Sequence, residues 1–323
     1  MNFGLLIIGD EILSGKRADK HLAKAIELLG ARGLQVAYAD YVGDAPERIT
    51  ATLQRAFASG DVVFSFGGIG ATPDDHTRQC AAKALGVPLQ LHPEAKRLIL
   101  ERMQDVAKEQ GIPYEPEHTD NLHRLNMGMF PAGCEIIPNP YNKIPGFFCR
   151  NHVVGERLSA AGPPQGAKAP SGGSDPRSGG AWGPQPAAGP PQGAKAPSGG
   201  SDPHAVGERG GVQFLPGFPV MAWPMVEWVL DTHYAHLFHA SPHEERSVIV
   251  FGAMEATLTP MMEALEAQYA VKVFSLPSVD HPEFGKHIEL GVKGAPQTVA
   301  VAYPAMLAQL RALQIGLGPE VVR

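Results

Sequence analysis

The chain has 323 residues, of which 44% are hydrophobic and 19% charged, and its formal net charge at pH 7 is −6. Because lysines and arginines are dispersed along this mildly acidic chain, it lacks the basic face of nucleic-acid-binding proteins, and no nucleic acid is expected as a partner. No apolar run approaches a membrane span, and the run Phe3–Ile8 lacks the basic flank of a signal peptide, so we expect a soluble, cytoplasmic protein without a membrane partner.

Apolar strands alternate with amphipathic helices through most of the chain. Leu34–Val42 is expected to be a strand because apolar and polar residues alternate in it. The other expected strands are short and mostly apolar: Leu5–Ile8, Asp61–Phe66, Glu135–Ile137, Gly146–Val153 and Val212–Leu215. The expected helices share helical spacing or a start signal: one contains Leu22, Ala25, Ile26 and Leu29, one starts at Asp44, and others cover Pro73–Leu85, Glu94–Glu109 and Pro219–His236. Apolar strands joined by helices predict a mostly parallel sheet that is covered on both faces.

A segment rich in Pro, Gly and Ser interrupts this pattern. The stretch Ala160–Pro176 recurs unchanged at Ala187–Pro203, which is a direct repeat. A segment with almost no large apolar side chains cannot offset its ordering entropy by burial. We therefore expect residues 154–211 to be a disordered insert in one larger domain, which is made of residues 1–153 and 212–242.

Residues 246–323 follow a different pattern. The expected elements are the strands Ser247–Phe251, Val271–Ser275 and His287–Val292 and the helices Thr257–Gln268 and Pro304–Gln314. This order, β-α-β-β-α, predicts a small two-layer α+β accessory domain. Since it lacks a GxxG loop with basic neighbours, a structural or dimer-forming role is favoured over RNA binding.

The chain contains three cysteines, Cys80, Cys134 and Cys149. They are far apart in sequence and form no CxxC motif, which argues against a disulfide framework and against a zinc knuckle. Cys80 lies on a helix face and is expected to be buried.

The sequence Gly67-Gly68-Ile69-Gly70 follows one of the expected strands, where open α/β sheets bind ligands. Glycines let main-chain N–H groups approach an anion, and a helix N-terminus adds positive potential. The loop is neither GxGxxG nor a Walker motif, since no Gly-Lys-Ser/Thr follows. We interpret it, together with Thr72, as a phosphate-binding loop; the alternative is a tight turn that needs positive φ.

Two adjacent carboxylates, Asp74 and Asp75, follow the glycines. If Thr72 is the N-cap of the next helix, Asp75 completes a near capping box, but a cap needs only one acid. A divalent cation such as Mg²⁺ bridges carboxylates and phosphate oxygens, so both groups can then share one site. The pair therefore predicts a metal site beside a phosphate, with helix capping as the alternative.

A second acidic turn follows the first strand and contains Asp10, Glu11, Ser14 and Asp19. Asp19 could cap the next helix, but its place in the first βα connection predicts that it shares a rim with the acids after the glycine loop. Ser14 is a candidate ligand contact on the same turn. Asp44, which begins a D-x-x-E sequence, is interpreted as a helix cap.

Two further loops are expected on the same side. In the loop Asn139–Lys143, Asn139 and Lys143 could contact a second phosphate or a ring substituent. The junction Leu215–Pro219 bends at Pro216 and Gly217, which are candidate ligand contacts. Either loop could instead be a rigid turn that binds nothing.

Four motifs occur in order along the chain: GDEILSG at Gly9–Gly15, GGIGATPDDHT at Gly67–Thr77, NPYNKIPG at Asn139–Gly146 and LPGFP at Leu215–Pro219. The series resembles the molybdopterin-binding-like domain of the competence/damage-inducible protein A family. Molybdopterin adenylyltransferases of molybdenum cofactor biosynthesis share that domain. The resemblance covers about residues 1–240 without the insert, and the unit after Arg246 looks like the accessory domain of that family.

The resemblance implies a three-layer α/β/α fold that binds a phosphorylated pterin or nucleotide, and it implies a homo-oligomer. Asp75 and Asp19 fall where the adenylyltransferases place catalytic, metal-linked acids. The family domain is associated with metal-dependent hydrolysis of ADP-ribose-type pyrophosphates. Three positions depart from the family pattern, since Ala71 replaces a proline, His21 an asparagine and Met221 a glutamate.

Three functions are therefore considered. The leading hypothesis is a Mg²⁺-dependent nucleotide pyrophosphatase in which Asp75 and Asp19 position the metal and the glycine loop holds the diphosphate. The second is a molybdopterin adenylyltransferase-like role, in which molybdopterin is a ligand of the same site. The third is a pterin- or nucleotide-binding module without catalysis.

Overall fold

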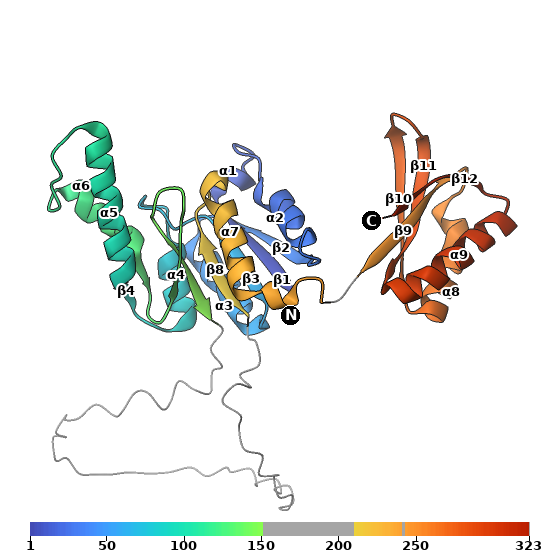
Figure 1. The fold of residues 1–323 in the computed structure, drawn as a ribbon, viewed down its shortest axis with the longest axis horizontal. Helices are drawn as coiled ribbons and strands as arrows, with labels where there is room; N and C mark the ends of the chain where they lie inside the picture. The colour runs from blue at the N-terminus through green and yellow to red at the C-terminus, as the bar shows by residue number, and fades with distance from the viewer. Residues whose placement is uncertain (151–209, 241–242, 323) are drawn as a thin grey trace, which may run out of the picture.

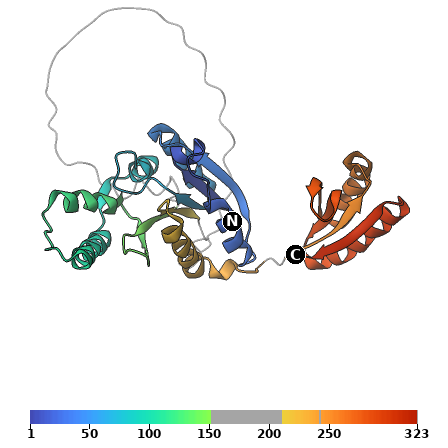
Figure 2. The ribbon, with the colours of Figure 1, turned by 90° about the horizontal axis from the view of Figure 1, so that it is seen from above.

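The computed structural model describes residues 1–150, 210–240 and 243–322, which form two units, each with its own main sheet (Figures 1 and 2). In the described part of the first unit, the main sheet has six strands in the order β2-β1-β3-β8-β7-β6. Their bounds are β1 (Phe3–Ile8), β2 (Val36–Val42), β3 (Val62–Phe66), β6 (Glu135–Ile137), β7 (Gly146–Arg150) and β8 (Gly211–Leu215). Strands β2, β1, β3 and β8 are parallel, and β7 is antiparallel to both of its neighbours. The predicted mostly parallel sheet is confirmed.

Helices cover both faces of this sheet. The helices α2 (His21–Gly30) and α7 (Pro219–His233) pack on one face, and α3 (Pro46–Ser59) and α4 (Thr77–Leu85) pack on the other. This arrangement confirms the predicted three-layer α/β/α fold. The predicted apolar face of α2 is only partly correct, since Ile26 is 54% exposed.

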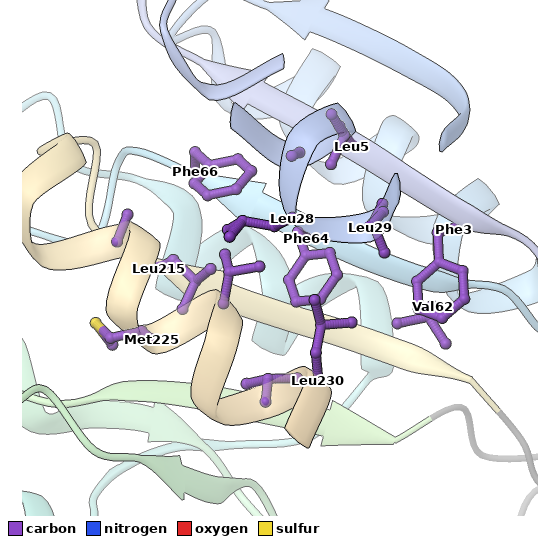
Figure 3. Packing of buried hydrophobic residues seen from close by; sticks show 14 of the residues in the cluster. Phe3, Leu5, Leu28, Leu29, Val62, Phe64, Phe66, Leu215, Met225 and Leu230 are labelled. Carbon is purple, nitrogen blue, oxygen red and sulfur yellow. The ribbon is translucent and has the colours of Figure 1, made fainter. Parts of the chain in front are cut away.

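The two hydrophobic cores follow from the side-chain alternation of the strands. In β1, Leu5 and Ile7 belong to the core under α2 and α7, whereas Leu6 and Ile8 belong to the core under α3 and α4. Figure 3 shows the first of these cores, where Leu28 and Leu29 of α2 and Met225 and Leu230 of α7 pack with Phe64 of β3. Because strands with two buried faces have no polar side, the sequence shows them as continuous apolar runs.

A smaller substructure lies between α4 and β6. It contains β4 (Leu89–Leu91) paired antiparallel with β5 (Met129–Pro131), the helices α5 (Pro93–Gln110) and α6 (Thr119–Leu125), and a 3₁₀ turn at Asn126–Gly128. Only α5 was predicted, because its buried residues recur every four positions. Three-residue strands and a helix without buried residues leave no such periodic signal.

The second unit contains a four-stranded antiparallel sheet in the order β10-β11-β9-β12. Its elements are β9 (Glu244–Phe251), α8 (Glu255–Tyr269), β10 (Lys272–His281), β11 (Gly285–Gly294), α9 (Pro296–Ala312) and β12 (Gly316–Val322). Both helices lie on one side of the sheet (Figure 2) and share one core with β9 and β11. The predicted small α+β unit is thus confirmed.

Two details of this unit were predicted wrongly. No expected element corresponds to β12, and the last helix was expected to begin at Pro304, whereas α9 begins at Pro296 and contains Pro304 in its interior. Residues Val299, Met306 and Leu310 are fully buried along one face of α9. Burial of this long face outweighs the hydrogen bond that an interior proline removes.

The described cysteines also differ from the prediction. Cys134 and Cys149 form a disulfide, and Cys80 is a buried free thiol as expected. In the β6–β7 hairpin Glu135 lies opposite Phe148, so the next pair in the register brings the two cysteines face to face. The two cysteines are 15 residues apart in the chain, so their spacing alone did not predict a disulfide.

The predicted insert lies almost entirely outside the described residues, since 151–209 are not described. The described chain resumes at Gly210, and β8 already begins at Gly211, within the predicted insert boundary. The longest described helix, α5, has 18 residues, and none of the described helices combines the length and apolar character needed to cross a membrane.

Candidate functional site

Five loops leave the first sheet at the same edge. Strands β1, β2, β3 and β8 run parallel, and β6 runs the same way because both it and β8 are antiparallel to β7. Their carboxyl ends, where α/β proteins bind ligands, therefore coincide. In Figure 1 the short helix α1 (Asp10–Leu13) and the start of α7 lie at this end. The loops enclose a cavity of about 670 Å³.

Most candidate residues from the sequence line this cavity. They are Gly67, Gly68, Gly70, Thr72, Asp74, Asp75, Asn139, Pro216 and Gly217. Ser14, Asp19 and Lys143 do not line it. The ammonium group of Lys143 instead forms an ion pair with Asp105 of α5 at 2.6 Å.

The glycine loop, Gly67 to Gly70, needs glycine for steric reasons. Gly67 and Gly68 have φ values of 99° and 68°, which side-chain-bearing residues rarely adopt. A Cβ atom would lie 2.3 Å from the Ile8 carbonyl oxygen at Gly67 and 2.1 Å from Thr77 Oγ1 at Gly68. The tight turn that the sequence offered as an alternative is therefore real. A tight turn does not exclude anion binding, because the glycines that allow the turn also leave its main-chain N–H groups open to a ligand.

The main-chain N–H groups of this loop differ in their hydrogen bonding. The N–H of Gly67 donates to the Leu215 carbonyl at 3.0 Å, which fixes the loop to β8. The next three N–H groups, those of Gly68, Ile69 and Gly70, donate no hydrogen bond to any part of the protein that the structure describes. Three successive donors without protein partners can therefore receive an anion.

Residues 71–75 form a turn rather than the start of a helix. Helix α4 begins at Thr77, with His76 as its N-cap, so the predicted start at Pro73 with Thr72 as the cap is wrong. Asp75 Oδ2 accepts hydrogen bonds from the N–H of Thr72 at 2.8 Å and from its hydroxyl at 2.6 Å. The sequence pattern of a cap and this turn use the same residue types, which explains the error.

The two acids of this turn have different surroundings. Asp75 is half-buried and bonded to Thr72, whereas Asp74 is exposed. Hydrogen bonding by Thr72 is also the main cause that lowers the pKa of Asp74. Asp74 is therefore an ionised carboxylate on the cavity wall, able to bind a cation.

Arg78, in the first turn of α4, is a buried cation behind the glycine loop that the sequence analysis missed. Its side chain is 3% exposed, and its Nη1 donates to the carbonyl oxygen of Ile69. Its Nε has no hydrogen-bond partner among the described residues. Burial lowers the pKa of Arg78, and the nearby charge of Asp75 opposes that shift. No periodic pattern reveals a buried arginine, since arginines are seldom buried.

His21 joins two walls of the cavity. It is the first residue of α2, is 5% exposed, and stacks on Phe66 with ring centroids 4.3 Å apart. Its Nε2 lies 3.1 Å from the carbonyl oxygen of Gly217, so it holds the turn after β8 against α2. Burial lowers the pKa of His21, which keeps the ring neutral.

Asp19 caps α2, as one reading of the sequence proposed. Its Oδ1 accepts from the N–H of His21 at 2.8 Å, and its Oδ2 accepts from the N–H of Leu22 at 3.1 Å and from the Tyr41 hydroxyl at 2.8 Å. Burial and the bond to Asp19 together raise the pKa of Tyr41 to about 12. Both carboxylate oxygens are thus engaged by protein donors, and Asp19 does not line the cavity, although its neighbours Ala18 and Lys20 do.

Asp44 does not cap α3, contrary to the prediction. Ala45 stands at the N-cap of that helix, and no side chain bonds there. Instead Asp44 and Asp10 bond each other's main chain, through Asp10 N–H to Asp44 Oδ2 at 2.9 Å and Asp44 N–H to Asp10 Oδ1 at 3.2 Å. Burial, and then the charges of Asp10, Glu11 and Asp74, raise the pKa of Asp44. Asp44 therefore adds to an acidic cavity wall.

Asn139 shapes its own loop. Its Nδ2 donates to Asn142 Oδ1 at 2.8 Å and to the Ile144 carbonyl at 2.9 Å, and its Oδ1 accepts from the N–H of Tyr141 at 3.0 Å. Its side chain is buried, so these bonds satisfy it. Asn142 and Ile144, which the sequence analysis did not single out, line the cavity beside it.

The carboxylates that line the cavity fit a metal ion that is held jointly by the protein and by a bound ligand. Within the described ranges, no group of three or more His, Cys, Asp or Glu side chains is placed to hold a metal ion. Asp74 and Asp75 offer carboxylate oxygens on one turn, next to the free N–H groups of the glycine loop. Mg²⁺ usually binds through one or two carboxylates, with substrate phosphates and water completing its shell. The residues present fit that mode and do not fit an all-protein metal site.

Comparison with known proteins agrees with the motifs. Residues 4–236 match the family described as "Probable molybdopterin binding domain". A CinA-like protein of Citrifermentans bemidjiense is 35% identical over 152 residues, which cover 46% of this chain and 34% of that protein. A putative competence-damage inducible protein of Alkaliphilus metalliredigens is 34% identical over 146 residues, covering 45% of this chain and 33% of that protein. The matched region is thus about a third of the length of these relatives.

A solved structure of similar architecture is that of the protein CinA, with unknown function, from Thermoplasma acidophilum. It is 23% identical to this chain, covers 71% of this chain and 96% of its own, and has a TM-score of 0.45. The family match spans well over half of the chain and contains all four motifs. The chain therefore belongs to the molybdopterin-binding-domain family, and its curated relatives are CinA-like, competence-damage inducible proteins.

Proposed function

We propose that this chain binds a small phosphorylated nucleotide in the cavity and, with Mg²⁺, hydrolyses its pyrophosphate bond, with an ADP-ribose-type molecule as substrate. One observation carries the proposal: the main-chain N–H groups of Gly68, Ile69 and Gly70, which have no partner among the described residues, lie beside two carboxylates in a cavity at the carboxyl edge of the sheet. A cavity of about 670 Å³ is of the size that holds a ligand of this class.

The glycine loop supplies the anion site. The N–H groups of Gly68, Ile69 and Gly70 can bond phosphate oxygens, and the N-terminus of α4 follows directly. The guanidinium group of Arg78, buried behind the loop, adds positive charge and holds the Ile69 carbonyl in place. These groups are fixed before the ligand binds, so little reorganisation is needed when charge develops on the phosphoryl oxygens.

The carboxylates need a cation to accept a phosphate next to them. Without one, Asp74 and Asp75 would repel the anion that the loop attracts. Asp74 and Asp75 would hold Mg²⁺, which would offset that repulsion and supply Lewis-acid polarisation of a phosphoryl group. Asp75 is kept in place by its two bonds from Thr72, and exposed Asp74 can turn toward a cation. We assign Asp19 a positioning role, since it caps α2.

Apolar side chains on the cavity wall suit a flat ring. Phe66, Ile144, Pro216, Phe218 and Met221 line it, and Phe218 is 55% exposed. An exposed aromatic ring at a cavity mouth can stack on a nucleobase or a pterin. This wall therefore supports a ligand with both a ring and a phosphate.

The test is turnover of ADP-ribose by the full chain with Mg²⁺, followed by chromatography of AMP and ribose phosphate. We expect hydrolysis that a chelator abolishes and that both Asp74→Asn and Asp75→Asn reduce at least tenfold. Because Asp75 also shapes its turn, exposed Asp74 is the cleaner variant. Asp40→Asn, an exposed acid that does not line the cavity, is the control and should keep full activity. Binding of ADP-ribose without turnover under all these conditions would refute the hydrolase and leave a binding module.

A second candidate is adenylyl transfer to molybdopterin. The observation in its favour is the family match to molybdopterin-binding domains, which covers this cavity. The two functions are distinguished by supplying MgATP and molybdopterin. Formation of adenylylated molybdopterin, with no hydrolysis of ADP-ribose, would favour transfer.

A further inference from the structure

Charged side chains of both signs line the cavity. The acidic residues that line it are Glu11, Asp44, Asp74 and Asp75. Among the described lining residues the cationic side chains are Arg17 and Lys20, and both come from the connection between α1 and α2. The proposed function uses neither of them.

The backbone that carries these two cations is fixed at both ends. The N–H of Arg17 donates to the carbonyl oxygen of Glu11 at 2.9 Å, which closes the connection onto α1. Beyond it, the carboxylate of Asp19 holds the first N–H groups of α2 and accepts the Tyr41 hydroxyl. Arg17 and Lys20 therefore start from defined positions on the cavity rim, although their side chains are exposed.

Neither cation is used by the protein itself. In the parts of the chain that the structure describes, no ion pair or hydrogen bond involves the guanidinium group of Arg17 or the ammonium group of Lys20. Two partly buried cations of α2 and the turn after it do have partners: Lys24 binds Glu27 at 2.6 Å, and Arg32 binds Asp231 at 2.8 Å. Because Arg17 and Lys20 line the cavity and have no partner among the described residues, both are free to bind an anionic group of a ligand.

The N-terminus of α2 does not provide an anion site of its own. Its first N–H groups, those of His21 and Leu22, already bond Asp19. Positive charge on this wall therefore comes from side chains, while on the wall after β3 it comes from the main chain of the glycine loop. The cavity thus offers two anion-binding positions of different chemistry.

We propose that Arg17 and Lys20 form a second anion subsite, which binds the phosphate next to the one held by the glycine loop. This inference rests on the proposed function and extends it: the site selects a diphosphate over the monophosphate of the same nucleoside. Arginine and lysine both bind phosphate oxygens through charge-assisted hydrogen bonds, and arginine can do so in bidentate fashion.

The test compares ADP with AMP by calorimetric titration of the full chain with Mg²⁺. We expect the wild type to bind ADP about tenfold more tightly than AMP, as two solvent-exposed phosphate contacts allow. The double variant Arg17→Gln, Lys20→Gln should lose this preference while its affinity for AMP stays within about twofold. The preference of the wild type should also shrink when NaCl is raised to about 0.3 M, since exposed charges are screened.

Lys16→Gln is the matched control, because Lys16 lies on the same connection and is exposed but does not line the cavity. It should keep the preference for ADP. If the double variant keeps that preference, or if Lys16→Gln loses it equally, the subsite is refuted while the proposed function stands. If the wild type binds neither nucleotide, the proposed function fails and the subsite fails with it.

Discussion

Replacement of Gly67 by alanine tests whether the glycine loop is packed as tightly as the structure shows. With φ at 99°, an alanine would be strained there by about 1–2 kcal/mol. Its Cβ would also lie 2.3 Å from the backbone oxygen of Ile8, which no side-chain rotation can relieve. Overpacking of this kind costs about 1–3 kcal/mol more. The total expected loss is therefore about 2–5 kcal/mol in the free energy of unfolding.

Gly60→Ala is the matched control for this variant. Gly60 also has positive φ, 77°, but a Cβ there would meet nothing within 4 Å. Only the backbone strain of about 1–2 kcal/mol should remain, and the gain from a less flexible unfolded chain is the same in both variants. Urea unfolding followed by tryptophan fluorescence measures the difference, because Trp223 and Trp228 both lie in α7 of the first unit. Equal losses in the two variants would refute the close contact between Gly67 and β1.

Three further predictions concern single groups. Burial lowers the pKa of His21 below 6.5, so the protein takes up a proton on unfolding when the pH is below 6.5. The free energy of unfolding should therefore fall by about 1.4 kcal/mol per pH unit as the pH drops from 6.5 to the lowered pKa. In urea titrations, His21→Asn should remove the contribution of His21 to this pH dependence. Denatured protein should react with one equivalent of a thiol reagent, through Cys80, and with three after reduction; three equivalents before reduction would exclude the Cys134–Cys149 disulfide. Arg78→Met should weaken nucleotide binding about tenfold, and unchanged affinity would contradict a role of Arg78 in the anion site. The variant should lower the free energy of unfolding by no more than about 1–3 kcal/mol, because removal of a buried charge offsets the lost hydrogen bond to the Ile69 carbonyl.

The sheet and its layers could be predicted because burial determines the strands. Leu5 to Ile8 is apolar without interruption, and Val62 to Phe66 is apolar except for the buried Ser65, because helices cover both faces of the sheet. The positions of loops at the ends of those strands then follow from the topology alone. This is why nine of the twelve candidate contacts line one cavity although they come from separate parts of the chain.

The orientation of individual carboxylates could not be predicted in the same way. Thr72 and Asp75 fit a helix cap by residue type, yet they bond each other in a turn before α4. Asp44 has the sequence of a capping box, but its carboxylate bonds Asp10 in the neighbouring loop. In both cases a short polar side chain can choose between donors within its own segment and donors brought near by the fold. Only the tertiary structure decides between them.

Helices α2 and α4 both begin at the ligand edge, but their first N–H groups differ in hydrogen bonding. Helix α2 starts with N–H groups that Asp19 already bonds, so that N-terminus is satisfied by the protein. Helix α4 has no side-chain cap, and it follows the glycine loop, in which the N–H groups of Gly68, Ile69 and Gly70 have no partner among the described residues. An anion that enters the cavity can therefore gain main-chain hydrogen bonds from the glycine loop before α4, but not from the first N–H groups of α2. If Asp19 were replaced by alanine, α2 would lose its cap, and the first N–H groups of α2 would compete for the same anion.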